Sequence, residues 1–132
     1  MIVVDTNVIA YLFLDSTHTE PARHWLATDG DWHVPVLWRS EFKNILALYM
    51  RKNMLTQKQA TAVYGQALSR LVQFEFQPDG AAVLALAAKS GCTAYDCEFI
   101  ATAYALKTRL LTADKPLQKA FPRETLCFTD EP

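Results

Sequence analysis

The fold begins with a short apolar run that ends on a carboxylate, IVVDTN at residues 2–7. The three apolar residues are all β-branched and follow one another without alternation, a pattern typical of a strand that is buried on both faces of a sheet. The polar residues interrupt this run at once, and apolar residues at helical spacing then continue to about Leu14. A buried strand that passes directly into a helix is the first half of an α/β unit.

The same alternation continues to the end of the chain. Further short apolar runs predict strands at residues 32–34, 74–76, 109–112 and 125–128, and the intervening patterns predict helices at residues 20–27, 36–52, 56–72, 79–90, 93–107 and 115–120. Gly91 is expected to end the helix before it as a left-handed residue. We therefore predict the α/β class, as one domain over residues 1–132, with a mostly parallel central sheet of about five short strands and helices on both faces.

Composition excludes several classes of protein. A chain that is 51% hydrophobic, with 4 Gly and 6 Pro in 132 residues, is neither disordered nor dominated by linkers. Three cysteines without a CxxC pair disfavour a secreted fold held by disulfides. The apolar start lacks the basic region of a signal peptide, and no run approaches the roughly 20 apolar residues of a membrane span. We expect a soluble, cytoplasmic protein without membrane contact.

Aspartates follow two of the predicted strands. Asp5 comes directly after the first apolar run, and Asp114 lies two residues beyond the strand at 109–112. Ligands bind at the carboxyl ends of the strands in open α/β sheets, so these two side chains mark a candidate site. Each aspartate also precedes a helix, and capping of that helix is the alternative interpretation.

A third acid lies at the start of the predicted helix 93–107. Asp96 shares a stripe with apolar residues such as Phe99 and Ile100, which places its carboxylate at the tip of the buried face. A capping box with Thr93 is the alternative role. Glu98 points elsewhere on this helix, and we expect it to be a solvated surface acid.

Glu41 lies on the apolar side of the predicted helix 36–52, between the directions of Ile45 and Leu48. Acids rarely lie there unless they are paired or bound to a metal. Arg39 and Lys43 are two residues away, and residues at that spacing do not face each other on a helix. A functional role is therefore favoured over a local ion pair.

Four acids gathered at one sheet edge would repel one another unless a cation neutralised them. A cluster of carboxylate oxygens suits Mg²⁺ or Mn²⁺ and not zinc. Such an ion activates a water molecule and stabilises the charge that develops during displacement at phosphate. The sequence therefore predicts metal-dependent phosphate chemistry.

Four motifs in order along the chain resemble those of the PIN-domain ribonucleases, and in particular the VapC-type toxins of toxin–antitoxin pairs. They are VVDTNVI at 3–9, Pro35 with Glu41 six residues later, YDC at 95–97 and LTAD at 111–114. The resemblance covers essentially the whole chain. Two departures are Cys97, where small residues are common, and Lys115 with Pro116, where some members carry a further acid.

The resemblance implies a parallel sheet with helices on both sides and endonucleolytic cleavage of RNA. It also implies a homodimer and an antitoxin protein that covers the site. Four carboxylates match the acids that bind Mg²⁺ or Mn²⁺ and activate the hydrolytic water: Asp5, Glu41, Asp96 and Asp114. Thr112 matches a hydroxyl position within the acidic cluster, and Asn7 a polar position beside the first acid; both are expected to support the site.

The formal net charge of −1 conceals a segregation of charge along the chain. Residues 1–38 hold one basic and five acidic side chains, whereas residues 39–75 hold six basic and two acidic ones. We expect Arg39, Lys43 and Arg51 to guide the RNA backbone towards the site. The alternative is an ordinary solvated helix face.

Three other functions compete with a metal-dependent nuclease. A receiver-type signalling domain also uses acids with Mg²⁺ and often has Lys-Pro after a late strand, but it normally has an acidic pair after the first strand, where Asp5 is followed here by Thr6. A PIN-like RNA-binding module without cleavage is disfavoured because all four acids are present. A histidine-based ribonuclease is disfavoured because the three histidines lie far in sequence from the acidic motifs.

Overall fold

The five strands of the fold are short and lie in one sheet. In the computed structural model, which describes residues 1–132, they are β1 (Ile2–Val4), β2 (Trp32–Pro35), β3 (Glu75–Phe76), β4 (Leu110–Thr112) and β5 (Thr125–Cys127). Their order across the sheet is β3-β2-β1-β4-β5, and each neighbouring pair is parallel. The carboxyl ends of all five strands therefore meet at the same edge, with β1 in the middle.

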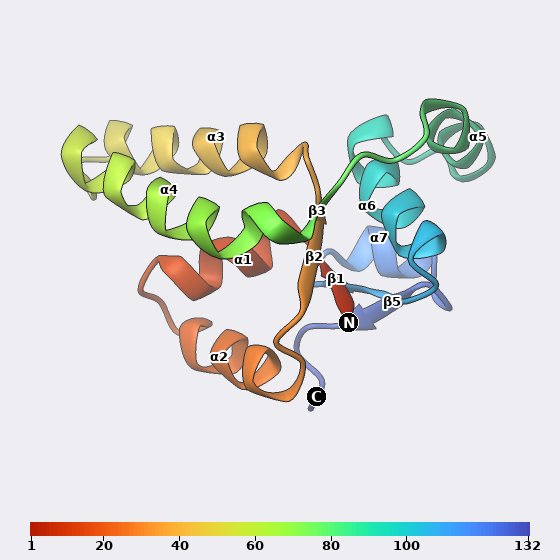
Figure 1. Cartoon of the computed structure of the whole chain (residues 1–132), viewed down its shortest axis with the longest axis horizontal. Helices are drawn as coiled ribbons and strands as arrows, with labels where there is room; N and C mark the ends of the chain where they lie inside the picture. Colours follow the sequence, from red (N-terminus) through yellow and green to blue (C-terminus); the bar gives the residue numbers. More distant parts are fainter.

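Seven α-helices cover the sheet (Figure 1). They are α1 (Thr6–Phe13), α2 (Thr19–Thr28), α3 (Trp38–Arg51), α4 (Gln57–Leu71), α5 (Gly80–Ser90), α6 (Ala94–Ala105) and α7 (Lys115–Ala120), with a 3-10 turn at Val72–Phe74. Helices α1 to α4 lie on one side of the sheet and α5 to α7 on the other, and α3 with α4 extends outward as an arm (Figure 1). None of the helices has both the length and the apolar character needed to cross a bilayer.

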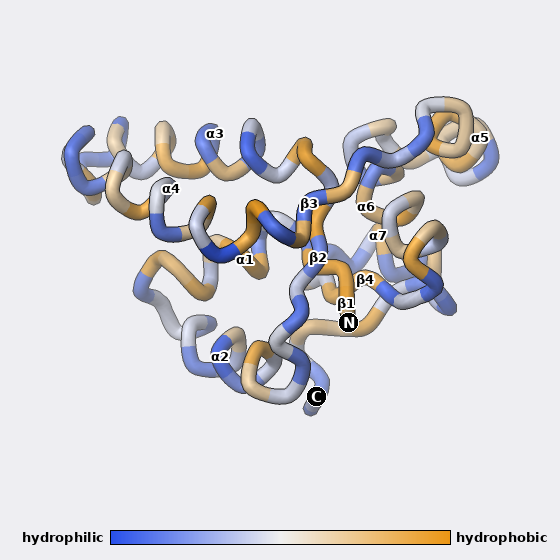
Figure 2. Tube along the Cα trace, viewed as in Figure 1, coloured by the Kyte–Doolittle hydropathy of each residue, from blue (hydrophilic) through white to orange (hydrophobic).

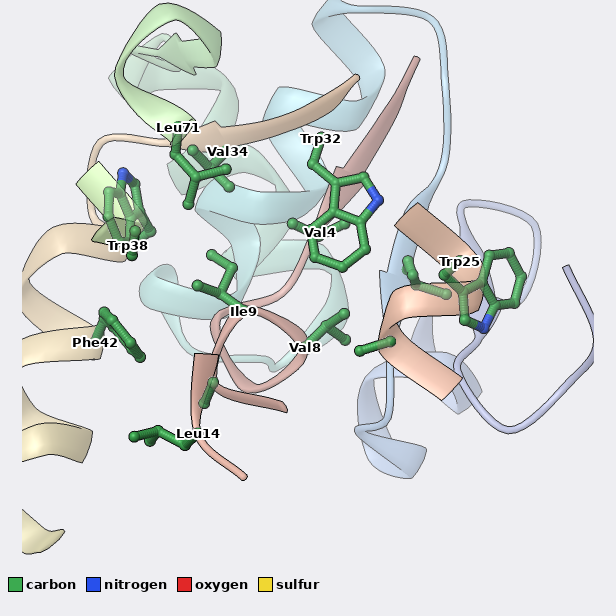
Figure 3. Close-up of a cluster of buried hydrophobic side chains, with 14 of the residues drawn as sticks. Val4, Val8, Ile9, Leu14, Trp25, Trp32, Val34, Trp38, Phe42 and Leu71 are labelled. Atoms are coloured by element: carbon green, nitrogen blue, oxygen red, sulfur yellow. The ribbon is translucent and has the colours of Figure 1, made fainter. Parts of the chain in front are cut away.

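Alternation along β1 creates two separate cores. Ile2 and Val4 point into a cluster of 18 buried residues on the α1–α4 side, whereas Val3 joins a cluster of 10 on the α5–α7 side. On the neighbouring strand β4, Leu111 belongs to the first cluster and Leu110 to the second. Large aromatic side chains fill the first core (Figure 3), and the far end of the α3–α4 arm is hydrophilic (Figure 2). Each fully buried aliphatic side chain contributes about 1.5–3 kcal/mol, so the central strands anchor both layers.

The helix ends follow local chemistry. Thr56 and Gln59 form a complete capping box at the start of α4, in which each side chain accepts from the other residue's backbone N–H. Gly91 ends α5 with φ of +73°, as the sequence predicts, because only glycine adopts this conformation without a steric penalty from Cβ. The predicted α/β class and the parallel sheet are confirmed.

Most predicted boundaries differ from the observed ones by no more than two residues, and two of the differences lie next to β2 and β3. The third helix begins at Trp38 instead of Val36, because the Val36 N–H donates to the carbonyl of Phe76 (3.0 Å) and continues the β2–β3 pairing. The strand predicted from Phe74 begins one residue later, since Phe74 belongs to the 3-10 turn. The first difference comes from pairing with a distant residue, and the second from a local turn.

The strand order also decides against the receiver-type alternative. Flavodoxin-like domains, which include receivers, place their third strand beside the first in the order 2-1-3-4-5. Here β3 pairs with β2 at the edge of the sheet, and β1 pairs with β4. The topology therefore differs from that of a receiver domain.

Candidate active site

The carboxyl edge of the sheet brings together acids from the first and last thirds of the chain. Val4 pairs with Leu111, and the Asp5 N–H donates to the Leu111 carbonyl at 3.0 Å, so the β1–β4 pairing extends to Asp5. Asp114 follows β4 two residues later and caps α7. The two aspartates that end predicted strands thus lie at the centre of the same edge.

Both oxygens of the Asp5 carboxylate accept short hydrogen bonds. Oδ1 accepts from the Thr6 N–H at 2.7 Å, and Oδ2 accepts from the Thr112 hydroxyl at 2.7 Å. The first bond caps α1, so the capping interpretation of Asp5 is correct. The second bond ties the carboxylate to β4, which a helix cap alone does not require.

Thr112 links the two aspartates of this edge. Its hydroxyl donates to Asp5 and accepts from the Asp114 N–H at 3.0 Å. The Asp114 Oδ1 atom in turn accepts from the Leu117 N–H at 3.0 Å. The strand end, the hydroxyl and the start of α7 therefore fix the two carboxylates relative to each other.

Glu41 lies in the first turn of α3 and is half-buried. The buried hydroxyl of Thr6 donates to its Oε1 atom at 2.7 Å. Neither nearby base pairs with it: Arg39 forms two hydrogen bonds of 2.6 Å with Glu75, and Lys43 lies over the ring of Tyr64. The expected absence of a local ion pair is confirmed, and the partner of Glu41 is a hydroxyl group from α1.

Asp96 is half-buried in the first turn of α6. Its backbone N–H donates to the Thr93 hydroxyl at 3.1 Å, which forms the helix cap. The carboxylate has no basic partner, because the three ion pairs of the chain lie elsewhere: Met1 amine with Asp29, Arg23 with Glu20, and Arg39 with Glu75.

Burial and the charges of neighbouring acids raise the pKa values of Asp5, Glu41 and Asp96. Burial is the largest cause at Asp5 and raises its pKa, with the charges of Asp96 and Asp114 adding to it and the bonds from Thr112 and Thr6 opposing it. Burial also raises the pKa of Glu41, with Asp5, Asp96 and Glu98 adding. The pKa of Asp96 is raised by burial and then by Asp114. These couplings show that the four carboxylates share one electrostatic environment.

Two residues of this region were missed or misjudged from the sequence. Thr6 holds Glu41, which no sequence signal indicated, because the contact depends on how α3 crosses α1. Glu98 is half-buried, and its charge raises the pKa of Glu41, so the prediction of a solvated acid pointing away is wrong. Helix α6 packs against β1 and β2, beside the strand that leads to Asp5. Asn7 is exposed beside Asp5, and its side chain forms no hydrogen bond with the protein.

The donor set fits a hard divalent cation by its chemistry. It consists of carboxylate oxygens that no base neutralises. The pKa values of Asp5, Glu41 and Asp96 are raised, and a cation relieves the repulsion that contributes to this. As they stand in this structure, no three or more His, Cys, Asp or Glu side chains form a group that could hold a metal ion. The fit therefore depends on the oxygen donors and their uncompensated charge.

A family comparison agrees with this arrangement. The model of the PIN domain matches residues 2–121. The chain belongs to the PIN domain family. Among curated proteins, this PIN domain is similar to Ribonuclease VapC3 of Pyrobaculum aerophilum, with 29% identity over 127 residues, which covers 92% of this chain and 95% of that protein.

Solved structures share the PIN fold. PAE2754 from Pyrobaculum aerophilum superimposes with a TM-score of 0.76 and 20% identity, over 96% of this chain and 90% of that one. FitAcB from Neisseria gonorrhoeae superimposes with a TM-score of 0.72 and 20% identity, over 97% of this chain and 98% of that one. A chain of a toxin–antitoxin complex from Klebsiella pneumoniae superimposes with a TM-score of 0.72 and 16% identity, over 98% of this chain and 99% of that one. At these identities the likeness shows the fold, and the predicted PIN-like architecture is confirmed.

Proposed function

We propose that this PIN domain is a metal-dependent endoribonuclease and the toxin of a toxin–antitoxin pair. The observation that carries the proposal is the meeting of uncompensated carboxylates at the carboxyl edge of the sheet, in a chain of this family. The similarity to a protein named Ribonuclease VapC3 supports RNA as the substrate. The fold shared with a toxin–antitoxin complex supports an antitoxin partner.

Four side chains would hold Mg²⁺ or Mn²⁺: Asp5, Glu41, Asp96 and Asp114. When bound, the ion lowers the pKa of a coordinated water and stabilises negative charge on the phosphate and the leaving oxygen. The surrounding protein orients the donors. Thr112 holds one oxygen of Asp5, and Thr6 holds one oxygen of Glu41, each through a 2.7 Å bond that leaves the carboxylate negative. Preorganised donors of this kind reduce the cost of arranging the site for reaction.

The α3–α4 arm would contribute to binding of the RNA backbone. Arg51 is exposed near the far end of α3, and Lys43 is exposed on the same helix, so both keep their charge available to phosphate groups. Arg39 differs because Glu75 neutralises it through two hydrogen bonds. We therefore expect Lys43 and Arg51 to contribute more to RNA affinity than Arg39.

Replacement of Asp96 by Asn tests the assignment of the site. We expect Asp96→Asn to fold, and to lose Mn²⁺ binding by calorimetry and RNA cleavage together. Asp79→Asn is the matched control, because Asp79 also lies at a helix start but caps α5 through the Ala82 N–H. Cleavage by Asp96→Asn at the wild-type rate, with wild-type cleavage insensitive to EDTA, would contradict a metal site. RNA binding by the wild type without cleavage in Mn²⁺ would instead favour a binding module.

Co-expression tests the toxin role and the partners. Induction of the chain should arrest growth, and a small protein encoded beside it should relieve the arrest by covering the site. Asp96→Asn should be harmless in the same host. Normal growth during expression of an enzyme that is active when purified would contradict the toxin role. The homodimer that we also propose can be measured by light scattering of the purified chain.

A further inference from the structure

The segment that follows the last acidic motif carries a concentration of unpaired positive charge. Residues 107–123 contain five of the thirteen basic side chains of the chain and one acid, Asp114. All five bases are exposed, and none takes part in an ion pair. We call this set the basic edge: Lys107, Arg109, Lys115, Lys119 and Arg123.

Helix α7 places Lys115 and Lys119 beside the candidate site. It starts directly after Asp114, and its buried residue Leu117 packs into the core on the α5–α7 side of the sheet. Lys115 and Lys119 are four residues apart and share the opposite, solvent-facing side of the helix. Their charges therefore lie on the surface that begins at the acidic cluster.

Two of the remaining three bases lie at the amino ends of β4 and β5. Arg109 directly precedes β4, and Arg123 lies two residues before β5. These strands are parallel neighbours with Leu110 opposite Thr125, so the two arginines lie at the same, amino edge of the sheet. Helix α7 connects the two edges (Figure 1). The positive charge therefore extends along one side of the domain, from the site to the amino edge.

The acid that follows the basic edge in the sequence does not pair with it. Glu124 accepts a hydrogen bond from the Tyr104 hydroxyl at 3.0 Å, and its other oxygen is buried without a partner. The acids of the C-terminus, Asp130 and Glu131, line a pocket with α2 on the opposite side of the sheet. The surface formed by α7 and the starts of β4 and β5 is therefore positive.

We infer that the basic edge binds the phosphate groups of the RNA strand on the side of the site away from the α3–α4 arm. This inference rests on the proposed ribonuclease function. The strand order puts α3 and β3 on one side of the central acids and α7 and β5 on the other, so bases flank the acids on both sides. An RNA strand that crosses the site would therefore contact basic side chains on both sides of the acids. An acidic protein would also be attracted by the positive charge of the basic edge. The carboxylates of the site would repel such a protein, so its binding would not extend across them.

The test removes two charges from the basic edge. Lys115→Gln/Lys119→Gln is made in the Asp96→Asn background, so that cleavage does not disturb the measurement. The probe is a fluorescein-labelled single-stranded RNA, and its anisotropy is titrated at several KCl concentrations. Each phosphate contact contributes about 0.7 to the salt slope for single strands, so loss of two should lower the slope by about 1.4 and weaken binding by about 10- to 30-fold at 0.1 M salt. Lys58→Gln/Lys89→Gln, which removes two exposed lysines from α4 and α5, should change both values much less.

Three outcomes would overturn the inference. The first is unchanged RNA affinity and salt slope, and the second is an equal loss in the Lys58→Gln/Lys89→Gln control. The third is an equal loss of affinity for a labelled oligoglutamate, which would assign the edge to acidic proteins. Failure of the ribonuclease proposal is a separate result, because wild-type cleavage in Mn²⁺ is measured independently of RNA binding. Circular dichroism of each variant confirms that the fold is retained.

Discussion

Replacement of Thr6 by valine isolates the hydrogen bond that holds Glu41. Thr6 is 3% exposed, and its hydroxyl donates to the carboxylate at 2.7 Å. Valine has nearly the same shape, so the packing of α1 against the core is retained. The variant removes one charge-assisted bond and leaves the carboxylate in place.

The size of the effect follows from the environment of this bond. A hydrogen bond to a charged group contributes about 1.5–3 kcal/mol, and the partial exposure of Glu41 lets water replace some of it. We therefore expect a loss of about 1–1.5 kcal/mol in the free energy of unfolding at neutral pH. A chain of 132 residues has an unfolding entropy of about 280 cal/mol/K, so Tm should fall by about 4–5 °C.

The loss should depend on pH. The Thr6 hydroxyl lowers the pKa of Glu41, against the larger effect of burial, so it favours the ionised carboxylate. Its removal raises that pKa further. The destabilisation is therefore fully present above the pKa of Glu41 and shrinks as the pH falls and the carboxylate takes up a proton.

Thermal unfolding of the metal-free protein at neutral pH and at about pH 4 measures this difference. Thr102→Val is the matched control, because Thr102 is fully buried but donates to the neutral backbone carbonyl of Glu98 at 2.8 Å. Its effect should be the same at both pH values. An equal loss at both pH values for Thr6→Val, or a pH-dependent loss for Thr102→Val, would refute this account of Glu41.

Three further outcomes follow from the same electrostatics and backbone geometry. Asp96→Asn should raise the Tm of the metal-free protein at neutral pH, because burial and the charge of Asp114 disfavour the ionised carboxylate and raise its pKa. At low pH the wild-type carboxylate is neutral, so the substitution should change Tm little. A lower Tm at neutral pH would contradict this account. Mn²⁺ should raise the Tm of the wild type but not of Asp96→Asn, as measured by differential scanning fluorimetry. Gly91→Ala should cost about 1–2 kcal/mol in urea unfolding, because φ is +73°, and should leave RNA cleavage unchanged.

The fold was largely predictable because its elements are encoded locally. The β-branched run before Asp5 is buried on both faces, and Gly91 ends its helix in the left-handed conformation. One error lies at a residue whose conformation is set by a distant partner. Val36 continues a strand pairing with Phe76 that a search for helical periodicity cannot detect.

The site was predictable where chain geometry alone decides it. Asp5 and Asp114 follow neighbouring parallel strands, so their proximity follows from the topology. Glu41 was predicted as a candidate because an acid rarely lies on the apolar side of a helix unless it is paired or bound to a metal. The influence of Thr6 and Glu98 on Glu41 was not predicted, because it depends on how α1 packs against α3 and how α6 packs against β1 and β2. A single sequence does not encode those contacts in its spacing.

The hydrogen-bond partners of these acids leave their negative charge uncompensated. Arg39 and Lys43 lie within two residues of Glu41 in the sequence, yet one pairs with Glu75 and the other contacts an aromatic ring. A base turned inward would form an ion pair and leave little charge for a cation to neutralise. Threonine hydroxyls orient the carboxylates without removing their charge. The metal-free protein keeps that repulsion at a cost in stability, as functional sites commonly do. Lys43 meanwhile stays exposed on the surface.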